Sequence, residues 1–206
     1  MQISNGNYID LTKKTDGLLN LKKNDILDLT KSVPTLNKIR VAAGWDVNNS
    51  LFGGTFDLDL CAILLDKNGR PVDGMNPCVY YGKKKSTGIF LDGDNLTGEG
   101  DGDDENIYVT LNDIPATVDR IIFNVVIYNG IAKRQKFSKV KNAYVRIVDT
   151  EKNDSEICRY NLTEDGGDNT AVVFAELNKN NNNWEFMAIG DYKRASIEDL
   201  LNSYRK

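Results

Sequence analysis

The sequence predicts an all-β protein, a two-sheet β-sandwich with a few short helices, one of them at the C-terminus. Three observations predict this fold. Short segments with alternating or clustered apolar residues follow one another along the chain, as expected of strands. Turn-forming residues such as Asp, Asn and Gly separate these segments. Helical patterns are few, and no long crossover connection joins the strands, which favours a sandwich over an α/β fold.

The chain opens with an internal repeat. Residues 7–13 (Asn-Tyr-Ile-Asp-Leu-Thr-Lys) parallel residues 25–31 (Asp-Ile-Leu-Asp-Leu-Thr-Lys). We expect each copy to form an edge strand, because two copies are too few to build a solenoid. We interpret residues 1–20 as an N-terminal extension that carries the first strand-like copy. Residues 21–206 contain no linker-like composition and are predicted to form one domain.

Strand-like segments fill most of the chain from Ile39 onward. The clearest alternation lies in 56–65, where Phe56, Leu58, Leu60, Ala62 and Leu64 share one face. The turn after it, residues 66–69, ends in Asn-Gly, which accepts positive φ. The predicted strands are 39–47, 56–65, 78–81, 107–111, 120–128, 144–149, 157–162, 170–177 and 184–189, with the asparagines at 180–183 as a hairpin tip.

Two helical segments are expected. Residues 137–143 are predicted to form roughly one turn of helix. At the C-terminus, Ser196 and Asp199 have the spacing of a capping box. An apolar stripe follows with the spacing i, i+3, i+4 and i+7, formed by Ile197, Leu200, Leu201 and Tyr204. This pattern predicts a terminal helix that packs on the sandwich.

Composition excludes several kinds of site. The chain has no histidine, which rules out Ser-His-Asp and Cys-His catalysis and histidine-based zinc sites. Its three cysteines, Cys61, Cys78 and Cys158, are far apart in sequence and odd in number. We therefore expect buried free thiols in a reducing compartment rather than a disulfide framework.

The N-terminal residues also bear on the expected compartment. Met1–Thr12 lacks a charged segment followed by an apolar core, so no secretory signal is predicted. No apolar run approaches the roughly 20 residues that span a bilayer. The sequence therefore predicts a cytoplasmic protein that does not insert directly into a membrane.

Acidic residues are concentrated between positions 92 and 105. This segment contains seven Asp and Glu residues and no Lys or Arg. Since the whole chain has a net charge of −4, the remainder carries −4 − (−7) = +3. Such a segment attracts hard cations and repels nucleic acid.

The acidic residues of this segment alternate with glycines, which allow the backbone to turn so that oxygens converge. Asp94, Glu99, Asp101, Asp103, Asp104 and Glu105 supply carboxylates, and Asn95 supplies a neutral oxygen. Oxygen ligands without imidazole or thiolate select Ca²⁺, Mg²⁺ or Mn²⁺, and a flexible loop favours Ca²⁺. The spacing is not that of an EF-hand. The alternative is a solvated acidic loop, but such a loop would not require regularly spaced glycines.

Two neighbouring segments add candidate ligands. Alternation places Asp57 and Asp59 on one face of a strand whose same face becomes apolar at Cys61 and Ile63. Two like charges on a face that becomes buried require a counter-ion, unless this end of the strand is exposed to solvent. Asp46, at the end of the preceding predicted strand, is expected to reach the same end of the sandwich.

These motifs resemble the TerD family of tellurite-resistance and stress-response proteins, and the resemblance extends from Lys31 to Ile189. Its landmarks are Gly44-Trp45-Asp46, Phe56-Asp57-Leu58-Asp59, the acidic segment 93–105, Asn142–Val148, Glu164-Asp165, Thr170-Ala171 and Ala175-Glu176-Leu177. The long acidic motif is the most specific of them.

The resemblance implies a calcium-binding β-sandwich in a cytoplasmic stress-response system, with more than one bound ion. By position, the ligand pool comprises Asp46, Asp57, Asp59, Asp94, Glu99, Asp101, Asp103, Asp104 and Glu105. The implied partners are other stress-response proteins of the same system and a membrane protein. We expect a non-catalytic binding or scaffold module. The alternatives are a metal-dependent hydrolase that uses clustered carboxylates and a calcium-dependent adhesion or carbohydrate-binding module.

Overall fold

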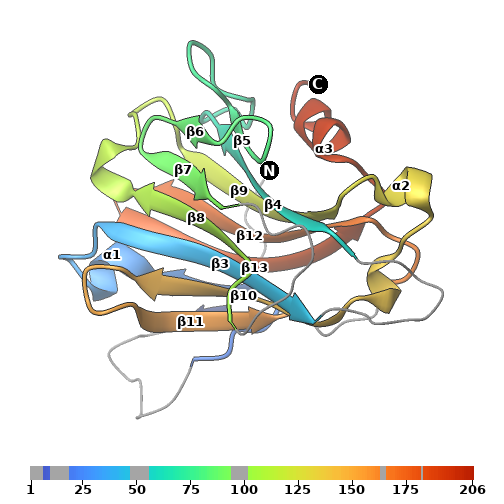
Figure 1. Ribbon diagram of the computed structural model, residues 1–206. Coiled ribbons are helices and arrows are strands. Elements are labelled where there is room, and N and C mark those ends of the chain that lie inside the picture. The colour runs from blue at the N-terminus through green and yellow to red at the C-terminus, as the bar shows by residue number, and fades with distance from the viewer. Residues whose placement is uncertain (1–6, 10–18, 47–55, 94–101, 163–165, 182) are drawn as a thin grey trace.

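The computed structural model describes residues 7–9, 19–46, 56–93, 102–162, 166–181 and 183–206. The chain folds into two β-sheets packed against each other (Figure 1), which confirms the predicted β-sandwich. In spatial order, the seven-stranded sheet contains β1 (Asn7–Ile9), β2 (Asp25–Asp28), β13 (Asn183–Lys193), β12 (Ala171–Asn180), β9 (Arg120–Ile127), β4 (Leu58–Leu65) and β5 (Cys78–Val79). The six-stranded sheet contains β11 (Ser155–Asn161), β10 (Lys141–Asp149), β3 (Lys38–Asp46), β8 (Glu105–Thr110), β7 (Ile89–Asp92) and β6 (Lys85–Ser86).

Helices are short and lie outside the sheets. Those in the described residues are α1 (Leu29–Ser32), α2 (Gly130–Lys133), α3 (Ile197–Ser203) and the 3-10 helices Leu111–Asp113 and Phe137–Lys139. None of the helices in the described ranges is long and apolar enough to cross a membrane.

Strand β4 shows how the sequence builds the core. Its residues Leu58, Leu60 and Leu64 are fully buried between the two sheets, as the alternation predicted. The opposite face of β4 is also buried, because α3 covers it, and Cys61 packs there in a second cluster with Leu200. The predicted capping box is confirmed, since the Ser196 side chain accepts from the Asp199 N–H while the Asp199 carboxylate accepts from the Ser196 N–H.

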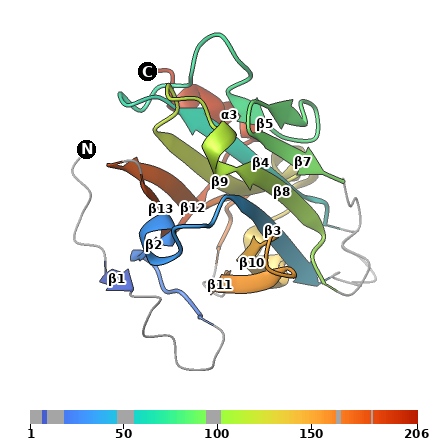
Figure 2. The ribbon, with the colours of Figure 1, turned by 90° about the vertical axis from the view of Figure 1, so that its left-hand side faces the viewer.

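The strand-like parts of the two N-terminal repeats pair with each other. β1 pairs in parallel with β2, and Asn7, Tyr8 and Ile9 lie opposite Asp25, Ile26 and Leu27. The first three residues of the two copies therefore lie beside each other without an offset, at the rim of the molecule (Figure 2).

The second copy is a strand only over Asp25–Asp28. It is not the predicted edge strand, because it lies between β1 and β13, and the chain then forms α1, which the sequence did not predict. The Asp28 side chain caps this helix by accepting from the Lys31 N–H at 2.9 Å. The hydroxyl of Thr30 accepts from the Trp184 N–H at 2.8 Å and so attaches the helix to β13.

The predicted helix 137–143 is wrong beyond its first turn. A 3-10 helix ends at Lys139, and β10 begins at Lys141, which pairs with Asp46 of β3. Asn142 adopts a φ of 50° at an irregularity in this pairing. Long-range strand pairing therefore outweighs the local helical pattern.

Candidate metal centre

Strand pairing brings several of the predicted ligands to one end of the six-stranded sheet. β3 and β7 both pair antiparallel with β8, so their C-terminal ends lie beside the N-terminal end of β8. Ala43 lies opposite Glu105, and Asp92 lies opposite Asn106. The chain thus leaves the acidic segment next to the end of β3, where Asp46 lies, and enters it one strand farther along the sheet, at the end of β7.

The described residues include six of the ten predicted ligands. These six are Asp46, Asp57, Asp59, Asp103, Asp104 and Glu105. The other four, Asp94, Asn95, Glu99 and Asp101, lie outside the described residues, and their role stays a prediction.

Glu105 and Asp59 are the most deeply buried of the described candidates, with exposed fractions of 1% and 3%. Glu105 is the first residue of β8, and its carboxylate accepts from the backbone N–H of Leu60 in β4. This hydrogen bond joins the two sheets. It also brings the Glu105 side chain to the residue that follows Asp59.

Asp57 lies close to the same place. Burial raises the pKa of Tyr81, and the negative charges of Asp59 and Asp57 raise it further. Burial likewise raises the pKa of the Cys61 thiol, to which the charges of Asp59 and Glu105 contribute. Asp59 therefore shares one neighbour, Tyr81, with Asp57 and another, Cys61, with Glu105.

Asp104 and Asp46 form a second acidic group at the adjoining strand ends. The Asp104 carboxylate accepts from the Trp45 N–H at 2.9 Å. Burial raises the pKa of Asp104, and the charges of Asp103 and Asp46 add to this effect despite the hydrogen bond from Trp45. Asp46 is exposed and accepts from the side-chain amide of Asn142.

Asp103 has different surroundings. Its side chain is 5% exposed and binds two arginines, Arg40 at 2.6 Å and Arg146 at 2.7 Å. Although burial alone would raise the pKa of Asp103, the arginines outweigh it and hold that pKa below its usual value. The protein itself thus compensates this charge, and Asp103 anchors the end of the acidic segment to β3 and β10.

Tyr144 provides a second anchor for the same end of the segment. Its hydroxyl donates to the Gly102 carbonyl oxygen at 2.8 Å. The ring crosses β3 at Gly44, where a Cβ atom would lie 2.5 Å from the Tyr144 hydroxyl oxygen. A glycine at position 44 therefore makes room for the tyrosine.

The donor set fits a hard cation. The candidate side chains provide oxygen donors, which suit Ca²⁺ or Mg²⁺. Burial raises the pKa of Cys78 to about 12, so this thiol stays protonated and does not offer a soft thiolate ligand. Within the described ranges, no three His, Cys, Asp or Glu residues are placed to hold a metal ion by themselves. A complete site in this region would therefore need ligands from outside those ranges.

Known proteins of similar sequence point to one family. The model of the family described as "TerD domain" matches residues 18–204. "Tellurium resistance protein TerD" of Serratia marcescens is 41% identical over 188 residues, covering 90% of this chain and 96% of the relative. "General stress protein 16U" of Bacillus subtilis (strain 168) is 39% identical over 188 residues, with the same two coverages.

A solved structure shares the fold. It is the crystal structure of a homologue of the telluride resistance protein (TerD) from Streptomyces coelicolor A3(2), with a TM-score of 0.64 and 21% identity. The match covers 78% of this chain and 92% of that chain.

Proposed function

The chain belongs to the TerD family of tellurium-resistance and stress-response proteins, and from this premise we propose that it is a calcium-binding, non-catalytic binding or scaffold protein. Its motifs had indicated the same family. In this proposal calcium fixes the acidic end of the sandwich in a single conformation, and that end is the surface that a partner recognises.

One observation supports the calcium proposal most strongly. Asp59 and Glu105 come from different sheets and are both nearly inaccessible to solvent. Removing a carboxylate from water costs several kcal/mol unless other charges or hydrogen bonds compensate for it. Glu105 is the last of seven acidic residues in segment 92–105, and Asp59 precedes the residue to which Glu105 is hydrogen-bonded, so a divalent cation would stabilise this concentration of charge.

The two acidic groups suggest how more than one ion would be held. We assign Asp59 and Glu105 to one ion, with Asp57 nearby, and Asp46 and Asp104 to another. Asp94, Asn95, Glu99 and Asp101 would complete the six to eight oxygens that Ca²⁺ takes. We assign Asp103 a supporting role, because both arginines already hold its carboxylate.

The proposed cellular role follows the family. The protein would act in the cytoplasm with other stress-response proteins of the same system and with a membrane protein. The names of the relatives refer to tellurium resistance and general stress, and none refers to a reaction.

Calcium titration by calorimetry tests the assignment. We expect the wild-type chain to bind Ca²⁺, and Asp59→Asn to bind it at least about tenfold more weakly, since the variant loses a charged ligand. Asp113→Asn is the matched control. Asp113 is an exposed aspartate beyond the opposite end of β8, about 20 Å from Glu105.

One result would overturn the calcium proposal, and another would overturn the assignment of Asp59 to the site. One is the absence of calcium binding by the wild-type chain. The other is an affinity for Asp59→Asn equal to that of Asp113→Asn, which would remove β4 from the site.

A further inference from the structure

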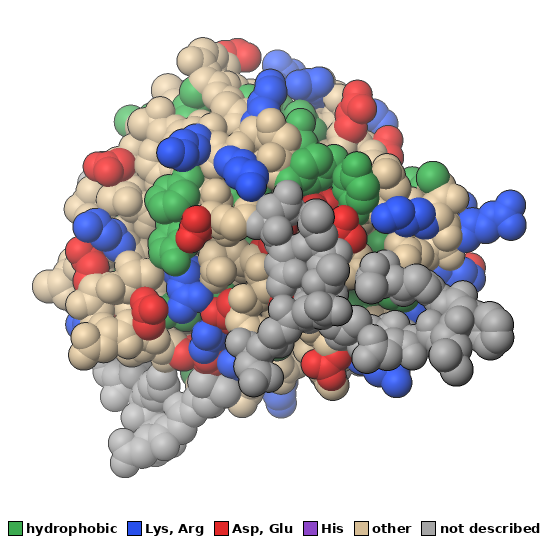
Figure 3. All heavy atoms as spheres, viewed as in Figure 1, with side chains coloured by type: hydrophobic (Ala, Val, Ile, Leu, Met, Phe, Trp, Pro, Cys, Tyr) green, Lys and Arg blue, Asp and Glu red, His purple; other side chains and the backbone are tan. Residues whose placement is uncertain are grey.

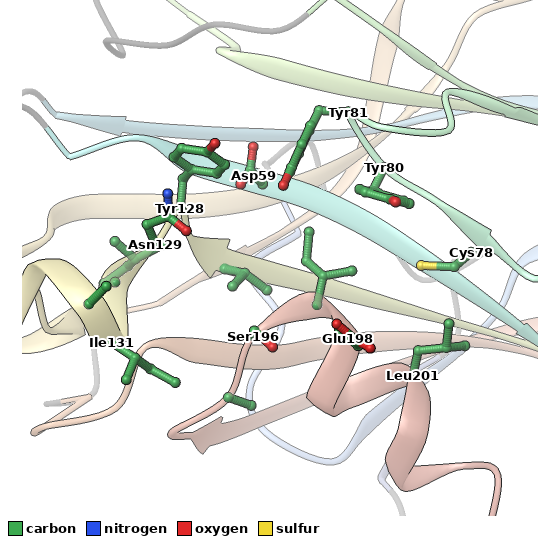
Figure 4. A pocket seen from close by; sticks show the side chains of 16 residues that line it. Asp59, Cys78, Tyr80, Tyr81, Tyr128, Asn129, Ile131, Ser196, Glu198 and Leu201 are labelled. Carbon is green, nitrogen blue, oxygen red and sulfur yellow. The ribbon is translucent and has the colours of Figure 1, made fainter.

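A cavity of about 530 Å³ lies on the outer face of the seven-stranded sheet. Its floor is formed by β4 and β9, and its walls by α2, α3 and the residues that follow β5. Figure 4 shows Asp59 between the side chains of Tyr81 and Tyr128, with Ser196 and Glu198 facing them from the start of α3. We call this cavity the tyrosine pocket. Its size suits a small organic molecule.

Three tyrosines form one wall of the tyrosine pocket. Tyr80 and Tyr81 meet edge to face with ring centroids 5.1 Å apart, and Tyr81 and Tyr128 do so at 5.5 Å. Each perpendicular contact fixes the direction in which a ring presents its electron-rich face. One of these rings already makes a cation–π contact within the protein, because the Lys133 ammonium lies 5.0 Å from the centroid of Tyr128.

Acidic side chains line the tyrosine pocket, while the Lys133 ammonium lies beside it against the Tyr128 ring. Asp59, which is 3% exposed, and Glu198 line it, and none of the described residues that line it is Lys or Arg. Most other lining side chains are apolar, among them Val126, Ile131 and Leu201. Figure 3 shows hydrophobic and acidic side chains next to each other between β5 and α3 on this face.

We propose that the tyrosine pocket binds a small organic ammonium ion that carries an apolar portion. Aromatic faces and nearby carboxylates attract an ammonium group, while the apolar walls of α2 and α3 receive its hydrocarbon part. The same carboxylates repel organic anions. A bare metal ion would leave most of the cavity and its apolar lining unused. This binding activity goes beyond the proposed calcium site.

The probe that tests the proposal is choline, and its control is 3,3-dimethylbutan-1-ol, which has the same shape without the charge. Binding is followed by the shifts of backbone amide signals in NMR spectra. Asp59 belongs to both proposed sites, so the titrations are made in EGTA, where calcium cannot compete. A chain that fails to bind calcium can still bind choline, and the two proposals therefore fail independently.

We expect choline to shift the amides of residues around Asp59, Tyr128 and Ser196, and to bind about tenfold more tightly than the neutral alcohol. Tyr128→Leu removes an aromatic face and should weaken choline binding by about threefold to tenfold. Glu198→Gln should weaken it without affecting folding, because Glu198 is exposed on α3. Tyr108→Leu is the matched control, since Tyr108 stacks on Phe90 in the other sheet and should leave binding unchanged.

The proposal is overturned if choline shifts no pocket amide, or if the neutral alcohol binds as tightly as choline. It is also overturned if both Tyr128→Leu and Glu198→Gln bind choline as the wild-type chain does.

Discussion

At the scale of single residues, acidic side chains that are neighbours in sequence have different surroundings in the fold. Asp103 binds two arginines, Asp104 accepts a backbone N–H, and Glu105 reaches across to the other sheet. Only Glu105 belongs to a strand, because β8 begins there and Asp103 and Asp104 precede it.

The role of Asp103 leads to a prediction about stability and pH. Its folded-state pKa is below the unfolded value of 3.8, so its stabilising contribution is complete above that pH and is lost as the pH falls through the folded-state pKa. We expect Asp103→Asn to lower the free energy of unfolding at neutral pH by about 3 kcal/mol, because it leaves two arginines without their shared partner. Urea unfolding at a series of pH values, with EGTA present, measures this loss.

The difference in unfolding free energy between the wild-type chain and Asp103→Asn should shrink as the pH falls below 3.8 and vanish below the folded-state pKa of Asp103, where both states are protonated. Asp168→Asn is the control, since it removes an exposed partner of Lys136 and should change stability little. A neutral effect of Asp103→Asn in EGTA would mean that the arginine pairs do not stabilise the fold.

The partners of Asp103 could not be predicted from the sequence. The sequence identified Asp103 as a candidate ligand from its place in the acidic segment. Its arginine partners lie 63 and 43 positions away, so nothing in the local sequence could reveal them. Arg40 lies on β3 and Arg146 on β10, and only the pairing of these strands brings them together.

At the scale of elements, α3 covers the outer face of the seven-stranded sheet, so that side chains on this face are buried. Leu200 is 1% exposed and packs against residues such as Cys61 and Ile63. The same helix forms one wall of the tyrosine pocket. The position of α3 therefore matters both for stability and for the proposed ligand.

We expect Leu200→Ala to lower the free energy of unfolding by about 2 to 4 kcal/mol, because it removes a buried side chain and leaves a cavity. Asn202→Ala is the matched control on the same helix; Asn202 is exposed, and its replacement should cost less than about 0.5 kcal/mol. Chemical denaturation measures both values. Equal stabilities of the two variants would show that α3 does not pack as described.

The elements that the sequence predicted best have strong patterns of their own. The alternation in β4 and the capping box of α3 are local signals, and both appear in the structure. β6 and β7 were missed because they are only two and four residues long and are defined by pairing with each other and with β8. The strand β10 extends back to Lys141 for the same reason, since β3 provides its partner.

At the scale of the whole molecule, the two sheets meet at an acidic end. Glu105 joins β8 to β4 there, and the chain enters and leaves the acidic segment at the same end. The sequence predicted the sandwich and this concentration of charge. It could not show which carboxylates become buried, because burial depends on how the two sheets pack.

Thermal unfolding in millimolar Ca²⁺ and in EGTA tests most directly whether calcium stabilises this acidic end. Calcium at about 100 times its Kd would add roughly 2.7 kcal/mol to the free energy of unfolding. For a chain of this size, that corresponds to a rise in Tm of about 5 to 10 °C. We predict this rise with Ca²⁺ and a smaller one with Mg²⁺. Equal Tm values in Ca²⁺ and EGTA would contradict the account.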